Sequence, residues 1–547
     1  MMMRRRKSRR VSPPPLRRCS TASIKSLNSN TCSIDHILTT DQLTLEDNNH
    51  GINVNVHYSL LHRIRRFFRF DALDLESTCM RNAKMMSTLD EGSVSYIYHY
   101  GVDVCFTDEY HLPASTLERY RKIGDPEMDQ LLTKLTNIGP FDDVISAAAT
   151  AAASNDPTIS ETSQELAQFY KHYEQVPSWV DFDQIQRGIN VFLAYLPAAA
   201  CALYYRSLVG GFSIPKIIEV LKSTRYLISD RKKTLERLID TGGLLAACFA
   251  PTNGHIPAES LRPGGKGWIA ALQVRVLHAK VRRRLLQRKR STSSQVWDTE
   301  KNGIPINQED LAATLLAFSV NVLVGIEIIA GTPLPVNEQL DYLALWRYIG
   351  WLLGIDTPES EDVSSNGSDD SREDSFPLDP CAPSMLHSYA SLESILVHIL
   401  HPEPSSCDLV THLLSVRGSM IAFRAEVCRR LIGNPLADAL GLQDCSCWNG
   451  WGADAIHTFV TSLFVKTAVF TYLMLFRFYT LLTMHSPWLK EKATIFHGEL
   501  EKKFLHKWEE GHSKRMRAAS KMDMTASAGA SEMSSSCPFS MVMPPQE

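Results

Sequence analysis

Apolar residues recur at intervals of three and four along most of the middle of the chain, as in helices that bury one face. The clearest stretches are IPKIIEVLKSTRYLI (214–228), TLERLIDTGGLLAACF (234–249) and EDLAATLLAFSVNVLVGIEIIAG (309–331). Asn307 precedes acidic residues at the start of the last stretch, which is typical of a helix beginning. Because alternating strand patterns are almost absent, the sequence predicts an all-α fold.

The same pattern divides the chain into one large helical domain with unstructured ends. Residues 1–50 are predicted to form a disordered basic leader, and residues 516–547 a disordered tail that is rich in Ser, Met and Ala. The helical domain is expected to run from 51 to 355 and to resume from 384 to 515. Between them, residues 356–383 are acidic, rich in serine and poor in apolar residues, which favours a flexible loop.

One apolar stretch, residues 459–483, is long enough to cross a bilayer. It contains Lys466 and Arg477, whose charges cost free energy at the centre of a membrane. Three interpretations remain open: a buried central helix, a helix that spans a membrane, and a helix that lies in the membrane interface.

Composition narrows the class of protein. The chain has 547 residues, of which 44% are hydrophobic and 21% are charged, and its net charge of −3 gives no general attraction to nucleic acid. The 12 cysteines are scattered and form no disulfide framework. The N-terminus is rich in Arg and Ser and lacks the apolar core of a secretory signal. It fits a mitochondrial presequence, a nuclear-type basic patch or a disordered tail.

A single histidine stands out in the stretch VRVLHAKVRRRLL (274–286). At helical spacing, His278 shares a face with Val274, Leu277, Val281 and Leu285. A neutral imidazole on such a sheltered face is a good iron ligand. The alternative is a core histidine whose ring nitrogens are satisfied by neighbouring groups.

Several short motifs place this histidine in a wider pattern. In order along the chain they are YRKIGDPEMDQLL (120–132), VPSWVDFDQIQRG (176–188), LERLIDTGGLL (235–245), VRVLHAKVR (274–282), GIPINQEDLAATLLAFS (303–319) and LWRYIGWLLGI (345–355). Together they resemble the latex-clearing-protein family, which contains bacterial rubber oxygenases and fungal oxygenases bound to the endoplasmic reticulum. The resemblance covers about residues 120–355.

The resemblance implies a globin-like helical bundle around a haem pocket, with haem b as cofactor and His278 as the proximal iron ligand. It also implies oxygen-dependent cleavage or oxidation of a C=C bond in an isoprenoid-type hydrophobic substrate. The expected partners are that substrate, molecular oxygen and a membrane, with no nucleic acid. The expected location is intracellular, at the endoplasmic reticulum or another internal membrane, with mitochondria as the alternative.

The distal side of the family's haem carries an Arg-x-x-Lys-Thr pattern in the rubber-cleaving members. The matching residues here are Arg237, Asp240 and Thr241, so the lysine is replaced by an aspartate. This departure argues against a resting state in which lysine and histidine both ligate iron, and it puts polymer cleavage in doubt. By the resemblance, Arg237 and Thr241 orient oxygen; otherwise Arg237 pairs with a neighbouring acid and Thr241 caps its helix.

Two acidic sites complete the candidate residues. Glu219 is the nearest match to a glutamate that acts as general base in rubber-cleaving relatives, and its alternative is a solvated charge on an amphipathic helix. Glu309 and Asp310 are expected to be structural, to satisfy a helix N-terminus and to pair with Arg275 or Arg282. The competing hypothesis for the whole chain is a non-catalytic, membrane-associated helical protein that binds haem or lipid.

Overall fold

The computed structural model describes residues 43–48, 51–56, 70, 94–99, 102–107, 114–135, 143–154, 160–224, 230–251, 257–287, 297–355, 399–418, 420–442 and 453–526. These residues form a predominantly helical body, so the predicted all-α class is confirmed. Among the described residues, the strands precede the helices and form two antiparallel hairpins, β1 (Leu43–Asn48) with β2 (Gly51–Val56) and β3 (Val94–His99) with β4 (Val102–Thr107).

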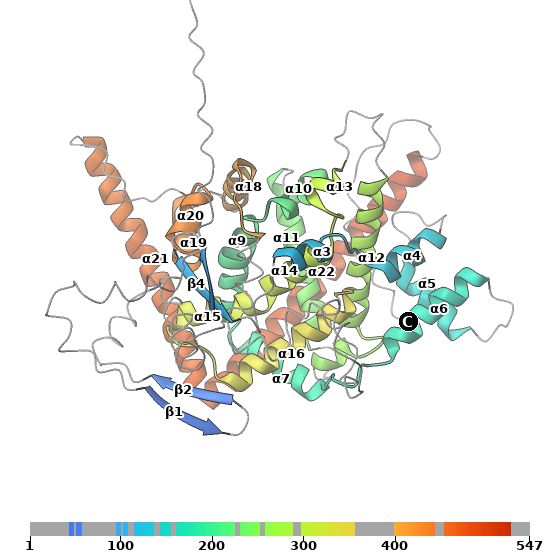
Figure 1. Cartoon of the computed structure of the whole chain (residues 1–547), viewed down its shortest axis with the longest axis horizontal. Coiled ribbons are helices and arrows are strands. Elements are labelled where there is room, and N and C mark those ends of the chain that lie inside the picture. Colours follow the sequence, from blue (N-terminus) through green and yellow to red (C-terminus); the bar gives the residue numbers. More distant parts are fainter. Residues whose placement is uncertain are drawn as a thin grey trace, which may run out of the picture.

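Figure 1 shows the first half of the helical body. Buried apolar side chains of its helices contribute to one continuous core. Its helices are α3 (Ala114–Tyr120), α4 (Pro126–Lys134), α5 (Val144–Ala153), α6 (Glu161–Glu174), α7 (Phe182–Ala194), α8 (Leu196–Cys201), the π-helical segment η4 (Ala202–Leu208), α9 (Val209–Gly211), α10 (Pro215–Ser223) and α11 (Arg231–Phe249). A π-helix of this length is rare. Segment η4 packs against α15, where a side chain larger than hydrogen at Gly325 would collide with Ala202.

The second half completes the same core. Its elements are the 3-10 turn η5 (Pro257–Leu261), α12 (Lys266–Leu286), α13 (Thr299–Asn302), α14 (Gln308–Phe318), α15 (Val320–Ala330), α16 (Val336–Leu352), α18 (Pro404–Ser415), α19 (Ile421–Ile432), α20 (Asn434–Ala439), α21 (Ala453–His485) and α22 (Pro487–Ala526). As predicted, Asn307 caps α14, accepting a hydrogen bond of 2.9 Å from the backbone N–H of Asp310.

Three of the expected segments do not coincide with the described elements: the leader, the tail and the acidic loop. Strand β1 falls within the predicted leader, and helix α22 continues to Ala526, past the predicted start of the tail at 516. The predicted acidic loop, residues 356–383, lies outside the described residues.

Two helices of the described residues are long and apolar enough to cross a membrane. One of them is mostly buried, and the other is mostly exposed. The one formed by α14 and α15, Gln308–Ala330, is buried in the body. The other, Phe459–His485 within α21, lies on the flank of the molecule with one side open (Figure 1). A bent pair, Phe182–Ala194 with Leu196–Gly211, would add a third span if counted as one. The interpretation of residues 459–483 as a buried central helix is therefore wrong.

Candidate functional site

Helix α12 carries His278 in the interior of the body. The helix begins after Gly265 and ends at Leu286, and most of its residues are buried. His278 as a whole residue is half-buried, and its Nδ1 atom is buried and has no hydrogen-bond partner among the described residues. The predicted alternative of a fully satisfied core histidine does not match this arrangement.

The protonation state of His278 follows from its surroundings. Burial, and to a lesser extent the positive charge of Arg282, lower the pKa of His278 to about 4, against an opposing effect of Asp125. The imidazole is therefore neutral at physiological pH, which is the form that ligates a metal ion.

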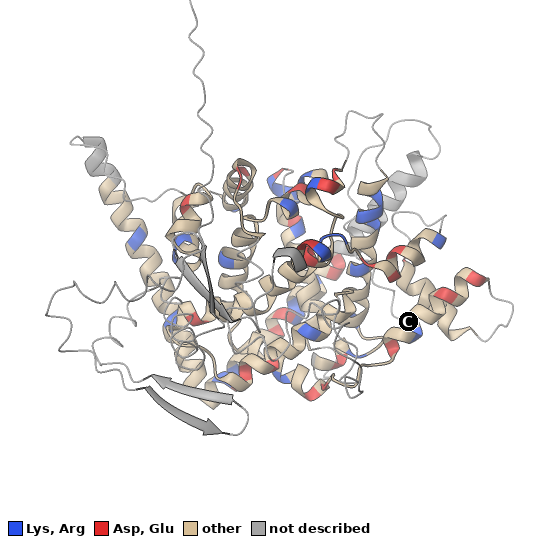
Figure 2. Cartoon of the chain, in the orientation of Figure 1, with Lys and Arg blue, Asp and Glu red and all other residues tan. Residues whose placement is uncertain are grey.

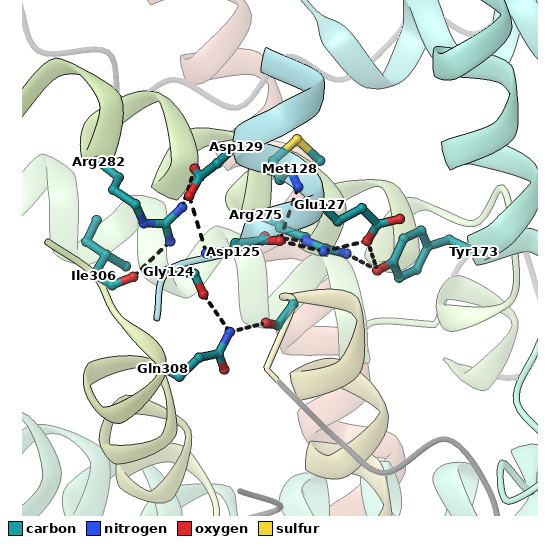
Figure 3. A network of polar contacts seen from close by, with 11 residues as sticks. Gly124, Asp125, Glu127, Met128, Asp129, Tyr173, Arg275, Arg282, Ile306 and Gln308 are labelled. Carbon is teal, nitrogen blue, oxygen red and sulfur yellow. Dashed lines mark hydrogen bonds and ion pairs between the residues drawn. The ribbon is translucent and has the colours of Figure 1, made fainter. Parts of the chain in front are cut away.

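Two arginines of α12 form a buried network with the start of α4 (Figure 3). The Arg275 guanidinium donates to both carboxylate oxygens of Asp125, at 2.6 and 2.8 Å, and to Glu127 at 2.8 Å. It also donates to the hydroxyl of Tyr173 on α6, which in turn donates to Glu127 at 2.8 Å. Arginine and carboxylate groups joined in this two-pronged way have a fixed relative orientation.

The second arginine, Arg282, joins α12 to α4 and to the segment before α14. Arg282 donates to Asp129 at 2.6 Å and to the backbone oxygens of Pro305 and Ile306 at 3.1 and 2.8 Å. The predicted partners of Arg275 and Arg282 are therefore wrong.

Glu309 and Asp310 have partners elsewhere. Glu309 pairs with Arg121 at 2.6 Å, and Asp310 accepts a hydrogen bond of 3.0 Å from the Asn307 amide. Burial, together with the negative charge of Glu309, raises the pKa of Asp310 to about 7, against an opposing effect of Lys216. Both residues support the start of α14, as expected.

Helix α11 holds the candidate distal residues Arg237, Asp240 and Thr241. It meets α12 where the backbone of Cys248 approaches Gly267 so closely that a Cβ atom on Gly267 would lie 2.8 Å from the Cys248 Cα. Arg237 is eleven residues before this contact and His278 is eleven residues after it. Each therefore stands about 16 Å along its own helix from the same point.

The distal candidates have defined neighbours. Thr241 donates a hydrogen bond of 3.1 Å to the backbone oxygen of Arg237 within α11, so it is an interior helix residue and not a cap. Arg237 is half-buried. Asp240 accepts a hydrogen bond of 3.0 Å from the indole of Trp508 on α22, whose ring also packs against Gly243. The one hydrogen bond described for the Thr241 side chain is therefore to its own helix and not to His278.

Glu219 lies on α10, where its carboxylate pairs with Lys222 at 2.7 Å. Its side chain is 28% exposed. A short-range pair on an amphipathic helix is the arrangement expected of a solvated surface charge. However, the adjacent Val220 packs against Leu277 and Val281 of α12, so α10 does border the histidine helix.

The GDPEMD motif (124–129) is apparent in the sequence, but the roles of its carboxylates are not. Asp125, Glu127 and Asp129 alternate along the first turn of α4, which is a detectable signal. Their partners lie about 150 positions away, and no local pattern identifies them. Trp508, which holds Asp240, lies outside all the motifs considered.

Comparison with known proteins agrees with the sequence motifs. Residues 194–461 match the family model described as ER-bound oxygenase mpaB/B'/rubber oxygenase, catalytic domain. A solved structure titled "Structure of Latex Clearing Protein LCP in the closed state" aligns with 69% of this chain and 91% of its own, at 18% identity and a TM-score of 0.45. No curated protein sequence matches the chain. Residues 194–461 of this protein, which include His278, Arg237, Thr241 and Glu219, therefore belong to the family of ER-bound and rubber oxygenases.

Proposed function

We propose that the protein is a haem-dependent oxygenase that binds iron through His278 and acts on a C=C bond of a hydrophobic, isoprenoid-type substrate. The observation that carries this proposal is the state of the His278 ring. It is neutral, and its buried Nδ1 has no hydrogen-bond partner among the described residues, inside the region that matches an oxygenase family. A buried polar atom without a partner calls for an explanation, and a bound ligand or ion is one.

The residues present fit a haem better than a metal ion held by several side chains. In the described part of the chain, no group of three or more His, Cys, Asp or Glu side chains is arranged to hold a metal ion. A haem needs only one axial ligand from the protein, together with apolar surroundings. His278 supplies the first, and Leu277, Val281 and Leu285 beside it form a buried apolar cluster. Haem b, when bound, supplies the iron at which oxygen reacts.

The roles proposed for the chain's own residues rest on their positions. Arg237 and Thr241 on α11 are the candidates to orient oxygen, because α11 packs against α12. Asp240 is a poor candidate for a second iron ligand, since its carboxylate accepts the Trp508 indole N–H. Glu219 is the candidate to remove a proton from substrate, and its pairing with Lys222 makes it the weakest of these assignments.

The proposed function includes association with a membrane through the outer face of α21. Exposed apolar side chains are concentrated on this helix and the start of α22: Val460 (57% exposed), Leu463 (56%), Phe464 (73%), Leu475 (64%), Leu482 (58%), Trp488 (64%), Ile495 (54%) and Phe496 (61%). Figure 2 shows little charge along α21. A surface of this kind is typical of contact with lipid.

The packing of α21 favours a helix that lies in the membrane interface over one that spans the bilayer. Its inner side packs against α19, which carries Arg424, Glu426, Arg429 and Arg430. The first three of these are buried in the body, but the Arg430 side chain is 41% exposed, and a bilayer crossed by α21 would bring it close to hydrocarbon. Arg477 is no obstacle to interfacial binding, because it is fully buried and donates to the backbone oxygens of Ile328 and Ile329. The endoplasmic reticulum, named in the family description, is the membrane we propose.

The first test is the ultraviolet–visible spectrum of the full chain expressed in a haem-sufficient host, compared with His278→Ala. We expect a Soret band in the wild type that is lost or strongly weakened in the variant. The control is His497→Ala, another buried histidine, whose Nδ1 has a partner in the backbone oxygen of Leu193 at 2.6 Å. This control should retain the band.

A folded wild-type protein without a Soret band would overturn the haem assignment. If haem binds, oxygen-dependent consumption of a prenyl compound then distinguishes an oxygenase from the alternative, a membrane-associated helical protein that only binds haem or lipid. Binding without turnover of any prenyl compound tested would favour the alternative.

A further inference from the structure

The two arginines of the buried network lie on either side of His278 along α12. Arg275 is three residues before it and Arg282 four residues after it, so the three side chains project from neighbouring positions on the helix surface. Both arginines are almost completely buried, at 3% and 2% exposed. His278 therefore lies between two buried, positively charged side chains along α12.

The anionic partners of both arginines come from one short segment. Asp125 caps α4 by accepting from the Met128 backbone N–H at 3.2 Å and holds Arg275, while Asp129, one turn later, holds Arg282. The two arginines are seven residues apart, or about 10 Å along the helix. The start of α4 therefore reaches from Arg275 to Arg282 (Figure 3). His278 lies between these two arginines along α12.

Arg282 also fixes a strained segment on another side of α12. It holds the backbone oxygen of Ile306, whose φ of +53° is unfavourable for a β-branched residue. Such a conformation persists only where its surroundings enforce it. The Ile306 side chain packs against the apolar cluster that contains Leu277 and Val281, the neighbours of His278.

One further side chain connects these segments. The Gln308 amide donates to the backbone oxygens of Gly124 and Gly354, at 2.9 Å each. The loop before α4, the start of α14 and the end of α16 are thereby held together beside α12. The hydrogen bonds from the arginines are directional, so they restrict rotation of α12 about its axis more strongly than apolar contacts do.

We propose that Arg275 and Arg282, held by the α4 carboxylates, are positioning residues that fix the rotation of α12 and so the direction in which His278 presents its ring to a haem iron. The proposal rests on the proposed function. It extends that function to residues 125–129, which lie outside the matched region, 194–461. An axial ligand must be held within about 0.5 Å and 10–20° of its working geometry, which requires a rigid support of this kind.

The experiment uses the full-length variants Arg282→Lys and Asp129→Asn. Lysine keeps the charge but cannot donate to all three acceptors in the same geometry. The matched control is Lys266→Gln, which removes an ion pair of 3.0 Å between α12 and Glu509 but lies at the start of α12, far from the histidine turn. Haem affinity is measured by Soret titration of apo-protein, and the iron–histidine bond by resonance Raman spectroscopy.

We expect both variants near the histidine to bind haem at least about tenfold more weakly than wild type and to shift the iron–histidine frequency. The control should do neither. Affinities within twofold of wild type, with an unchanged frequency, would overturn the proposal.

A second background separates positioning from general destabilisation. In His278→Gly with added imidazole, the ligand is no longer attached to α12. Adding Arg282→Lys or Asp129→Asn should then cause no further loss of haem affinity. An equal loss in this background would mean that the arginines only hold the fold together, which contradicts the proposal.

A readout without haem covers the case in which the proposed function fails. Histidine-labelled apo-protein gives a nuclear magnetic resonance signal for His278, assigned by its absence in His278→Gly. If wild type binds no haem, the proposed function is overturned. A displaced or broadened His278 signal in Arg282→Lys and Asp129→Asn, but not in Lys266→Gln, would still support the positioning role. An unchanged signal would refute it.

Discussion

From their polarity, helix α12 would be expected at the surface and helix α21 in the interior, but the structure has the reverse arrangement. Helix α12, with arginines at 275, 282, 283 and 284, lies in the interior, while α21, a far more apolar helix, lies on the flank with one side exposed. The difference lies in the partners. The arginines at 275 and 282 meet carboxylates and carbonyl oxygens of matching geometry, whereas the outer side chains of α21 meet few groups of the chain.

Arg477 shows that α21 follows the same rule on its inner side. This arginine is fully buried and donates to the backbone oxygens of Ile328 and Ile329, at the end of α15, where the carbonyl groups of a helix carry partial negative charge. A buried charge in this fold therefore indicates a specific set of acceptors. An exposed apolar side chain indicates a surface that contacts something other than water.

The largest effect is expected from breaking the arginine network of α12. Arg275→Ala leaves the buried Asp125 carboxylate without its cation, which should lower the free energy of unfolding by about 3–5 kcal/mol. Denaturant unfolding measures this change. Lys222→Ala, which removes the exposed pair with Glu219, should cost less than about 1 kcal/mol. Equal losses in the two variants would mean that the α12 pair is no more important than a surface pair.

A smaller effect, on binding and not on folding, is expected at α21. Phe464→Glu with Leu475→Glu should reduce flotation with phosphatidylcholine vesicles by about tenfold or more, because two apolar anchors are replaced by charges. The unfolding free energy should change little, since both side chains are exposed. The control pair is Leu286→Glu with Val336→Glu, apolar residues 47% and 52% exposed elsewhere on the body.

Two results would contradict membrane binding by α21. The wild-type chain could fail to float with vesicles, or the control pair could reduce flotation as much as the α21 pair. If the wild type instead forms a defined dimer that Phe464→Glu dissociates, the exposed face is covered by a second copy of the chain.

The comparison also separates what the sequence predicts from what it cannot. Periodicity located the helices that contain Glu219, Arg237, His278 and Asp310, because spacing along one helix is a local property. It did not identify the partners of Arg275 and Arg282. Glu309 and Asp310 are closer to these arginines in the sequence. The carboxylates that pair with them lie instead at the start of α4, about 150 residues away. Which side of α21 is covered is likewise a property of packing, since both sides are apolar.

An effect that appears only as the pH is changed is expected at Asp310, a buried carboxylate that has no ion pair with an arginine among the described residues. Asp310 accepts a hydrogen bond from the Asn307 amide, and burial raises its pKa to about 7 in the folded state. Because the folded-state pKa lies above that of the unfolded chain, near 3.9, its contribution to stability is present below about pH 4 and is lost as the pH rises towards 7.

Asp310→Asn should therefore flatten the stability curve between these pH values. The wild type should lose at most about 1.4 kcal/mol per pH unit relative to the variant. Unfolding free energies from denaturant titrations at pH 4, 5.5 and 7 measure the difference. Parallel curves would mean that Asp310 is ionised in the fold, stabilised by surrounding cations. The contrast between buried carboxylates with and without an arginine partner would then disappear, and a direct arginine pair would not be required to bury a charge in this protein.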